Sequence, residues 1–274
     1  MAGDLGFTEG PLWTATGRLL ATSLSRRCVY EIGPHGANVV ANLDASPSGL
    51  AEDSAGRIWI VHANDPRSEH PKAEAVGVSV LENGAVRHVV RAGLTAPNDC
   101  LVTPDGASLL ITDPAGEAFA ASGLPGAVRS LDLGRLQVTT LVDDCRYPNG
   151  IGLSPTGDAV YVAETAAARI LRFRYDGGRL TDRQVFFELT NGRPDGLCVD
   201  PAGNVLAATT TGDSVAVIDP LGNLVIEIPL GPGAFPTNLT LGGPRLETLF
   251  VTAAKGGRVL AITPDSRGLP SPLR

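Results

Sequence analysis

The chain has 274 residues and a formal net charge of −7 at pH 7. An acidic chain argues against a nucleic-acid partner, because phosphate binding needs clustered basic side chains. No apolar stretch approaches the length of a transmembrane helix, and residues 1–8 show no secretory signal, so we expect a cytoplasmic protein without a membrane partner. The four cysteines show no metal-ligand spacing, and we expect reduced thiols.

Six segments of similar pattern follow one another along the chain. In each, a polar residue, called an anchor here, stands eight positions before a turn glycine or before a distorted version of that turn. The anchors are Glu9, Ser48, Asn98, Asn149, Asp195 and Asn238, spaced 39, 50, 51, 46 and 43 residues apart. A period of about 45 residues in a β-rich chain predicts small sheets arranged radially.

The fourth segment shows the strand pattern most clearly. Residues 151–154 predict a short inner strand, and turn residues at 155–158 separate it from the β-rich apolar run 159–163. Residues 169–175 alternate apolar and polar side chains, as a half-buried strand does. A Gly-Gly hairpin turn then leads to a fourth strand that contains residues 185–188.

Four antiparallel strands per segment and six segments predict an all-β fold, a six-bladed β-propeller around a central channel, in one domain of residues 1–274. We expect the blades to cover roughly residues 9–42, 48–91, 97–142, 148–188, 194–229 and 236–265. The last segment shows three strands before a proline-rich tail, and proline disfavours a ladder strand. Since an open sheet edge needs cover, residues up to Phe7 should help to close the ring.

In a propeller the inner strands run along the channel, so all six anchors should meet at one mouth. The second strand of each blade returns to that mouth and brings its last residues near the anchors. Among those residues, Asp113 and Glu164 are expected to line a substrate site together with Ser48, Asn98 and Asn238. Polar residues before strands are also ordinary turn formers, and a single anchor would carry little weight.

Convergent carboxylates at one mouth repel each other unless a cation or protons lie between them. The oxygen donors of Glu9, Asn149 and Asp195 suit Ca²⁺, Mg²⁺ or Mn²⁺, with waters completing the coordination. No cluster of histidines and cysteines suggests a structural zinc site.

At these positions the chain resembles the gluconolactonase, senescence-marker-protein and luciferin-regenerating family. The resemblance covers nearly the whole chain, and the order and spacing of the motifs make it specific. The matching motifs are Glu9-Gly-Pro-Leu-Trp13, Pro97-Asn-Asp99, Pro148-Asn-Gly-Ile-Gly-Leu-Ser-Pro155, Pro194-Asp-Gly-Leu-Cys-Val-Asp200 and Pro236-Thr-Asn-Leu-Thr240.

The resemblance implies a six-bladed propeller with one divalent cation at the channel mouth. It implies Glu9, Asn149 and Asp195 as the metal ligands, and Asn98 as a contact to substrate or to a metal-bound water. We expect Ca²⁺, with Mg²⁺, Mn²⁺ or Zn²⁺ as alternatives. Many members of the family hydrolyse lactones of sugar acids, and relatives cleave other esters or phosphotriesters.

One position departs from the family. Sugar-lactonase members often carry an arginine two residues before the asparagine of the Pro-Asn-Asp motif, where this chain has Ala96. Such an arginine would grip the hydroxyl groups or the carbonyl group of the substrate. A less polar ester or lactone therefore fits this chain better than a sugar-acid lactone.

Metal-assisted hydrolysis of a small-molecule lactone or ester is the leading hypothesis. The cation would polarise the carbonyl group, Asp195 would act as general base, and Asn98 would orient substrate or water. His62, at the end of a second strand, is a further acid or base candidate near neutral pH. Two alternatives stay open: a metal-dependent cyclase, isomerase or lyase on the same scaffold, and a propeller that only binds a ligand.

Overall fold

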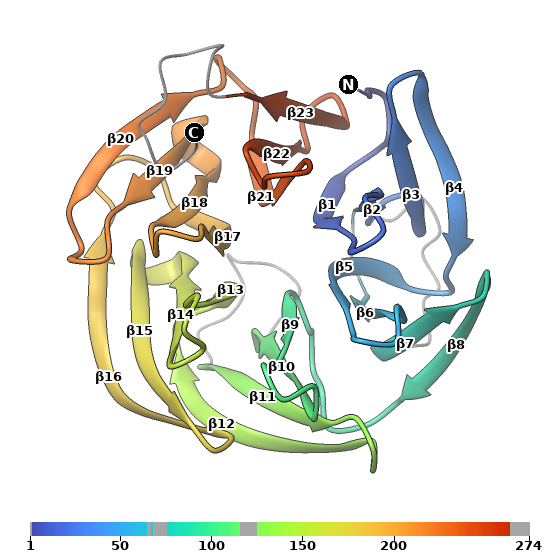
Figure 1. Cartoon of the computed structure of the whole chain (residues 1–274), viewed down its shortest axis with the longest axis horizontal. Helices are drawn as coiled ribbons and strands as arrows, with labels where there is room; N and C mark the ends of the chain where they lie inside the picture. The colour runs from blue at the N-terminus through green and yellow to red at the C-terminus, as the bar shows by residue number, and fades with distance from the viewer. Residues whose placement is uncertain (1, 65–66, 68–75, 116–124, 264–274) are drawn as a thin grey trace.

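The computed structural model describes residues 2–64, 67, 76–115 and 125–263. In this part the chain forms six small antiparallel sheets around a central channel, and each sheet pairs consecutive strands (Figure 1). Five sheets have four strands and one has three. The predicted all-β, six-bladed propeller is therefore confirmed.

Each blade runs from an inner strand beside the channel to an outer strand at the rim (Figure 1). The first three blades comprise β1 (Thr8–Trp13), β2 (Leu19–Ser23), β3 (Cys28–Gly33), β4 (Gly36–Asn42), β5 (Ser46–Glu52), β6 (Ile58–Ala63), β7 (Gly77–Glu82), β8 (Ala85–Val90), β9 (Cys100–Val102), β10 (Ser108–Asp113), β11 (Gly126–Asp132) and β12 (Gln137–Cys145).

The other three blades comprise β13 (Pro148–Leu153), β14 (Ala159–Glu164), β15 (Arg169–Asp176), β16 (Arg179–Glu188), β17 (Pro194–Val199), β18 (Val205–Thr209), β19 (Ser214–Ile218), β20 (Leu224–Pro229), β21 (Pro236–Gly242), β22 (Thr248–Ala253) and β23 (Arg258–Ile262). Two short 3-10 turns, Thr165–Ala167 and Thr210–Gly212, follow β14 and β18. No helix in the described ranges is long and apolar enough to cross a membrane.

The hydrophobic core lies between neighbouring blades. Between the second and third blades, Trp59 and Val61 pack with Leu109 and Ile111. Such contacts use alternate positions of the middle strands, because successive side chains of a strand point to opposite faces. The four cysteines are free thiols, and three of them are buried in or beside these interfaces.

The predicted turn glycines adopt the left-handed backbone conformation that a side chain would strain. Gly157 has a φ of +74°, and its amide donates a hydrogen bond to the carbonyl oxygen of Ser154 at 2.9 Å. Four other segments contain the same bond between the residue five positions after the anchor and the turn glycine. The repeated turn sends the second strand of each blade back toward the anchors.

The anchors differ from expectation in one respect. They were expected just before the inner strands, but in five blades they lie inside the strand, at a break in the pairing register. In the fourth blade Pro148 pairs with Glu164 and the next pair is Ile151 with Val162, so Asn149 stands in a bulge. A bulge leaves a residue unpaired and turns its side chain away from the ladder. Ser48 and Asp195 are unpaired in the same way, whereas Glu9 and Asn238 keep a strand partner at the edge of the break.

A glycine follows four of the six anchors, because neighbouring inner strands touch there through their backbones. A Cβ atom on Gly150 would lie 2.5 Å from both the carbonyl oxygen of Asp195 and the amide nitrogen of Leu197. A Cβ atom on Gly196 would lie 2.1 Å from the side chain of Asn238. Any larger residue at these positions would separate the blades.

Asp99 replaces that glycine in the third blade. Its carboxylate accepts hydrogen bonds from the amides of Cys100 at 2.9 Å and Ile151 at 3.3 Å, and from the side chain of Asn238 at 3.4 Å. Burial raises the pKa of Asp99 to about 6, although these hydrogen bonds partly lower it. The side chain thus connects the third, fourth and sixth blades across the channel.

The N-terminal residues lie on the three-stranded last blade. Ala2 forms a bridge with Val259, and the amides of Asp4 and Leu5 donate to the carbonyl oxygens of Gly256 and Gly257. The hydroxyl of Thr237 donates to the carbonyl oxygen of Thr8 at 2.8 Å, which joins the first and last blades. The expected proline-rich tail lies outside the described residues.

The Gly150→Ala substitution should lower the free energy of unfolding by about 1–3 kcal/mol, because the new methyl group overlaps backbone atoms of the next blade. Urea unfolding measures this difference. Gly134→Ala is the matched control, since the nearest atom to its new methyl group is 3.4 Å away in an exposed turn, and its effect should stay within about 0.5 kcal/mol. Equal effects of the two substitutions would contradict the close approach of the blades.

The Asp99→Asn substitution should make unfolding less dependent on pH. The folded pKa of Asp99, about 6, lies above the ordinary value, so its favourable contribution is complete below roughly pH 4 and is lost as pH rises through 6. Asparagine does not titrate. Between pH 4 and 7 the stability difference should move in favour of the variant by on the order of 2–3 kcal/mol. A difference that is constant with pH would refute the buried, perturbed carboxylate.

Candidate metal centre and active site

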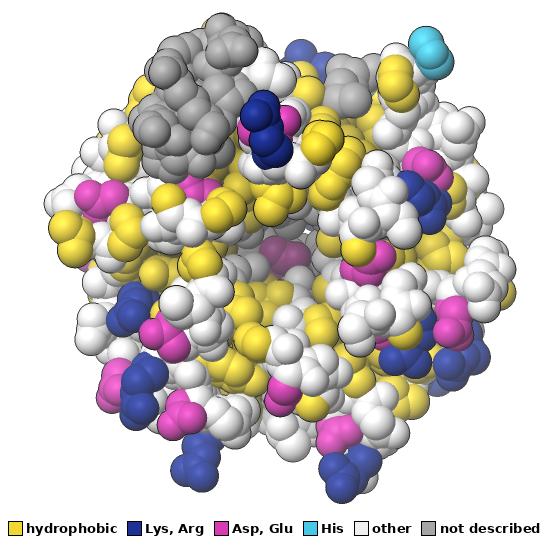
Figure 2. Space-filling view, in the orientation of Figure 1, with side chains coloured by type: hydrophobic (Ala, Val, Ile, Leu, Met, Phe, Trp, Pro, Cys, Tyr) yellow, Lys and Arg dark blue, Asp and Glu magenta, His cyan; other side chains and the backbone are white. Residues whose placement is uncertain are grey.

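Five of the six anchors line one cavity of about 430 Å³ at a mouth of the channel. They are Glu9, Ser48, Asn98, Asn149 and Asp195. Figure 2 shows that the centre of the ring is hollowed and that acidic side-chain atoms lie in the opening. The ring therefore brings together residues that are up to 186 positions apart, from 9 to 195.

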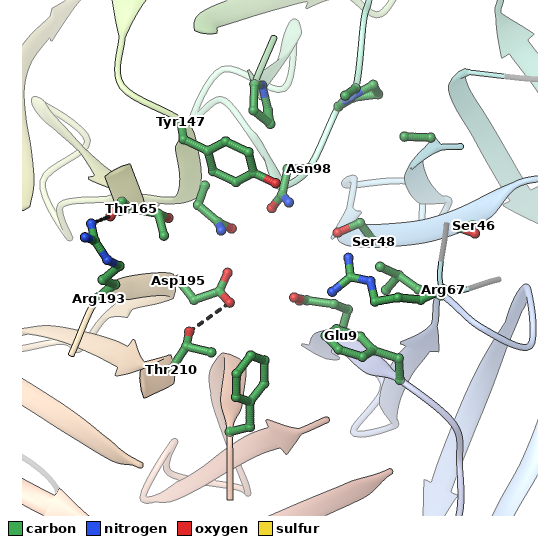
Figure 3. A pocket seen from close by; sticks show the side chains of 18 of the residues that line it. Glu9, Ser46, Ser48, Arg67, Asn98, Tyr147, Thr165, Arg193, Asp195 and Thr210 are labelled. Atoms are coloured by element: carbon green, nitrogen blue, oxygen red, sulfur yellow. Dashed lines mark hydrogen bonds between the residues drawn. The ribbon is translucent and has the colours of Figure 1, made fainter. Parts of the chain in front are cut away.

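Glu9 and Asp195 point toward one another across this cavity (Figure 3). The second carboxylate oxygen of Glu9 accepts the amide hydrogen of Gly10 at 3.1 Å, and the hydroxyl of Thr210 donates to Asp195 at 3.0 Å. Burial is the largest cause that raises the pKa of both carboxyls, for Asp195 to about 7, and their mutual repulsion raises the pKa of Glu9 further. The pKa of Asp195 thus lies close to neutral pH, and the pKa of Glu9 lies well above its ordinary value.

Asn98 presents an acceptor to the same cavity. Its side-chain carbonyl oxygen is buried and has no hydrogen-bond partner among the described residues. Its backbone is fixed, because its amide donates to the carbonyl oxygen of Thr112 and its own carbonyl oxygen accepts the amide of Gly49. A buried polar atom normally has a partner, so this oxygen points to a ligand.

The donor set fits a hard divalent cation. Glu9 and Asp195 supply carboxylate oxygens, and Asn149, on the same cavity wall, supplies an amide oxygen. Two buried carboxyls that repel each other are stabilised as anions by a cation between them. No cluster of three or more His, Cys, Asp or Glu side chains occurs among the residues that the structure describes, so the set is one of two carboxylates and amides.

Two predicted residues lie away from this cavity. His62 is buried between strands, where it shares a hydrogen bond with the hydroxyl of Ser79 at 2.9 Å and packs edge-to-face on His88. The sixth anchor, Asn238, bonds to Asp99 and lines a second cavity of about 320 Å³ deeper in the channel. Both side chains were expected at the mouth with the other anchors, and this prediction is wrong.

Two predicted acids are also absent from the cavity lining. Asp113 forms an ion pair with Arg129 at 3.1 Å and accepts the amide of Ala96 at 2.8 Å. Glu164 forms ion pairs with Arg169 and Arg183. Both carboxylates end a second strand as predicted, but each turns toward arginines of its own blade instead of the cavity.

A second ring of side chains surrounds the anchors and was not predicted as part of the site. In each of five blades the residue two positions before the anchor lines the cavity, and in four of them this residue lies in the connection before the inner strand. These residues are Phe7, Ser46, Ala96, Tyr147 and Arg193. The sequence could have predicted these positions, because each lies two residues before an anchor.

Arg67 also lines the cavity and lies in the connection between β6 and β7. Its guanidinium group stacks 4.0 Å above the ring centre of Phe7 and extends between Ser48 and Glu9 (Figure 3). Its charge lowers the pKa of both Glu9 and Asp195. No spacing in the sequence relates this residue to the anchors.

Several known proteins resemble this chain in sequence. A sequence profile described as SMP-30/Gluconolactonase/LRE-like region matches residues 7–255. A pentonolactonase from Haloferax volcanii is 31% identical over 187 residues, which cover 65% of this chain and 64% of that protein. The chain thus aligns with slightly less than two thirds of this curated relative.

Solved structures share the fold. A gluconolactonase from Xanthomonas campestris is 27% identical with a TM-score of 0.78, and the match covers 94% of this chain and 86% of that one. A calcium-binding protein, regucalcin, from Agrobacterium tumefaciens is 22% identical with a TM-score of 0.78, covering 95% and 90%. With the profile match over residues 7–255, the chain belongs to the SMP-30/gluconolactonase/LRE-like family.

Proposed function

We propose that this protein hydrolyses a small-molecule lactone with the help of one divalent cation. The observation that carries the proposal is the pair of buried carboxyls, Glu9 and Asp195, which face each other across an open cavity of about 430 Å³. The family contains lactonases, and two of the similar proteins named above are a pentonolactonase and a gluconolactonase. A lactone is small enough for this space.

Glu9, Asn149 and Asp195 are proposed to hold the cation, and their oxygen donors favour Ca²⁺ over softer metals. When bound, the cation supplies positive charge that offsets the two carboxylates and polarises the lactone carbonyl group. The calcium-binding relative from Agrobacterium tumefaciens has the same fold, which is compatible with this choice.

Asp195 is proposed as the general base. It removes a proton from a water molecule whose oxygen attacks the lactone carbonyl carbon, and it returns that proton to the ring oxygen as the ring C–O bond breaks. The product is a hydroxy acid. Burial raises the pKa of Asp195 to about 7 without the cation and so offsets the loss of basicity that a bound cation causes, and the hydroxyl of Thr210 holds one oxygen of the carboxylate in place. The amide of Asn98 orients the substrate or the water.

Removal of the cation should abolish hydrolysis. After treatment with a chelator, turnover of a γ- or δ-lactone should fall to the uncatalysed rate, and added Ca²⁺ should restore it. Ca²⁺ at about 100 times its dissociation constant should also stabilise the fold by about 2.7 kcal/mol, measured by urea unfolding. Chelator-resistant turnover would contradict the metal-dependent proposal, and bound metal without hydrolysis of any lactone would favour a non-hydrolytic enzyme.

The Asp195→Asn substitution should reduce kcat by about 10²–10⁴-fold, because the amide cannot accept the proton of the attacking water. The measurement is made at saturating Ca²⁺, with bound metal determined separately, since the substitution also removes a ligand charge. Asp219→Asn, in an exposed turn of the same blade, is the matched control and should keep full activity. Unchanged turnover by a metal-loaded Asp195→Asn variant would exclude Asp195 as the base.

A further inference from the structure

One sector of the cavity wall is apolar, and the proposed hydrolysis does not use it. It is formed by Phe7 just before β1, Leu24 just after β2 and Phe235 just before β21. The rings of Phe7 and Phe235 pack edge-to-face, with 6.3 Å between their centres. The first and last blades, which meet where the ring closes, therefore present a shared apolar surface to the cavity.

Phe235 has in the last blade the place that second-ring residues have in three other blades. In these four blades the carbonyl oxygen of the residue just before the inner strand accepts the amide hydrogen of the residue just after the second strand. The amides of Leu24, Thr165, Thr210 and Ala254 donate in this way to Phe7, Tyr147, Arg193 and Phe235, at 2.9, 3.1, 3.0 and 3.1 Å. The repeat itself thus fixes the backbone of both phenylalanines at the mouth.

The backbone of Phe235 is strained as well as fixed. Its φ is +53°, in the left-handed region that glycine adopts freely and that a side chain makes unfavourable. The carboxylate of Asp213 holds it there, because it accepts the amide of Phe235 at 2.8 Å and that of Gly233 at 2.6 Å. Strain of this kind is concentrated where a protein uses the side chain for function.

The Phe235 side chain is available to a ligand. It is 37% exposed, whereas Leu24 beside it is 6% exposed. The guanidinium group of Arg67 covers one face of the Phe7 ring, 4.0 Å from the ring centre. Phe235 therefore offers the most accessible part of the apolar surface, with Leu24 and the rest of Phe7 behind it.

The surface adjoins the groups proposed to act on the lactone. Phe7 precedes Glu9 by two residues, and all three apolar side chains line the same cavity as Glu9 and Asp195. This cavity of about 430 Å³ lies within the range of roughly 300–1,000 Å³ that is usual for sites of drug-sized ligands. A bare lactone ring leaves part of such a space to water. An apolar group on the ring would displace that water from the apolar wall, which is favourable in proportion to the area covered.

We infer that Phe7, Leu24 and Phe235 form a subsite for a hydrocarbon substituent, so that the preferred substrate is a lactone that carries an alkyl chain on its ring. The inference rests on the proposed lactone hydrolysis. It adds that the first and last blades select the substituent, while Glu9 and Asp195 act on the ring ester that substituted and unsubstituted lactones share.

The test compares two substrates with the same ring: γ-butyrolactone, and γ-octalactone, which carries a butyl chain on the carbon bonded to the ring oxygen. Each buried CH₂ group contributes a factor of up to about four, so the Ca²⁺-loaded protein should have a kcat/KM at least about 10-fold higher for γ-octalactone. Phe235→Ala should reduce that preference to about threefold or less and leave γ-butyrolactone within about twofold. Phe235→Leu, which keeps an apolar side chain, should retain most of the preference.

Leu246→Ala is the matched control. Leu246 is an apolar residue of the same blade, 42% exposed, with a φ of +55°, and it lies in the turn between β21 and β22. Its substitution should alter neither kcat/KM value. An equal loss on both substrates in Phe235→Ala, or no loss on γ-octalactone, would overturn the subsite. The same holds if the unaltered protein does not prefer γ-octalactone.

A binding measurement separates this inference from the proposed function. Cyclopentanone and 3-butylcyclopentanone have a CH₂ group in place of the ring oxygen and cannot be hydrolysed. Calorimetric titration of the Ca²⁺-loaded protein should show tighter binding of the butyl ketone, and Phe235→Ala should lose the difference. That result supports the subsite even if no lactone is turned over, in which case the proposed hydrolysis alone fails. Equal binding of the two ketones, or binding of neither, overturns the subsite even if both lactones are hydrolysed.

Discussion

Backbone contact between neighbouring inner strands is the constraint on which this site depends. A Cβ atom on Gly10 would lie 2.0 Å from the carbonyl oxygen of Ser48, so that position accepts only glycine without a shift of the blades. This approach narrows the channel until side chains from opposite blades share one cavity. In the second, fourth and fifth blades the break in register leaves the anchor unpaired and turns it toward the axis. Glu9 and Asp195 meet because the strands that carry them cannot move apart.

Burial of the two carboxylates is unfavourable for the free energy of folding, and stability from other parts of the structure compensates for it. Desolvation raises the pKa of both Glu9 and Asp195, while hydrogen bonds from Gly10 to Glu9 and from Thr210 and Asn149 to Asp195 lower it in part. The hydrophobic clusters between blades provide the stability that tolerates such a pair. In this arrangement a cation, a proton or a positive side chain is required at the mouth, and Arg67 supplies part of that charge.

The period of the anchors was sufficient to predict the ring and the meeting of five anchors at one mouth. It did not place His62, Asp113, Glu164 and Asn238, because the direction of a side chain at a strand end depends on its neighbours. Asp113 and Glu164 turn to arginines on the next strand, and Asn238 turns to Asp99, which stands where four other anchors are followed by glycine. Arg67 lies in a connection without periodicity, so its position follows only from the folded chain.

The residues of the second ring are distinct from the anchors, so substrate recognition can change in evolution separately from the proposed catalytic groups. Each of its members, from Phe7 to Arg193, belongs to a different blade and stands two residues before an anchor. A substitution there changes the shape or charge of one sector of the cavity and leaves the anchors in place. Ala96 and Arg193 illustrate this freedom, since equivalent positions hold a methyl group and a guanidinium group. Substrate range in this architecture can therefore drift one blade at a time without passing through an inactive protein.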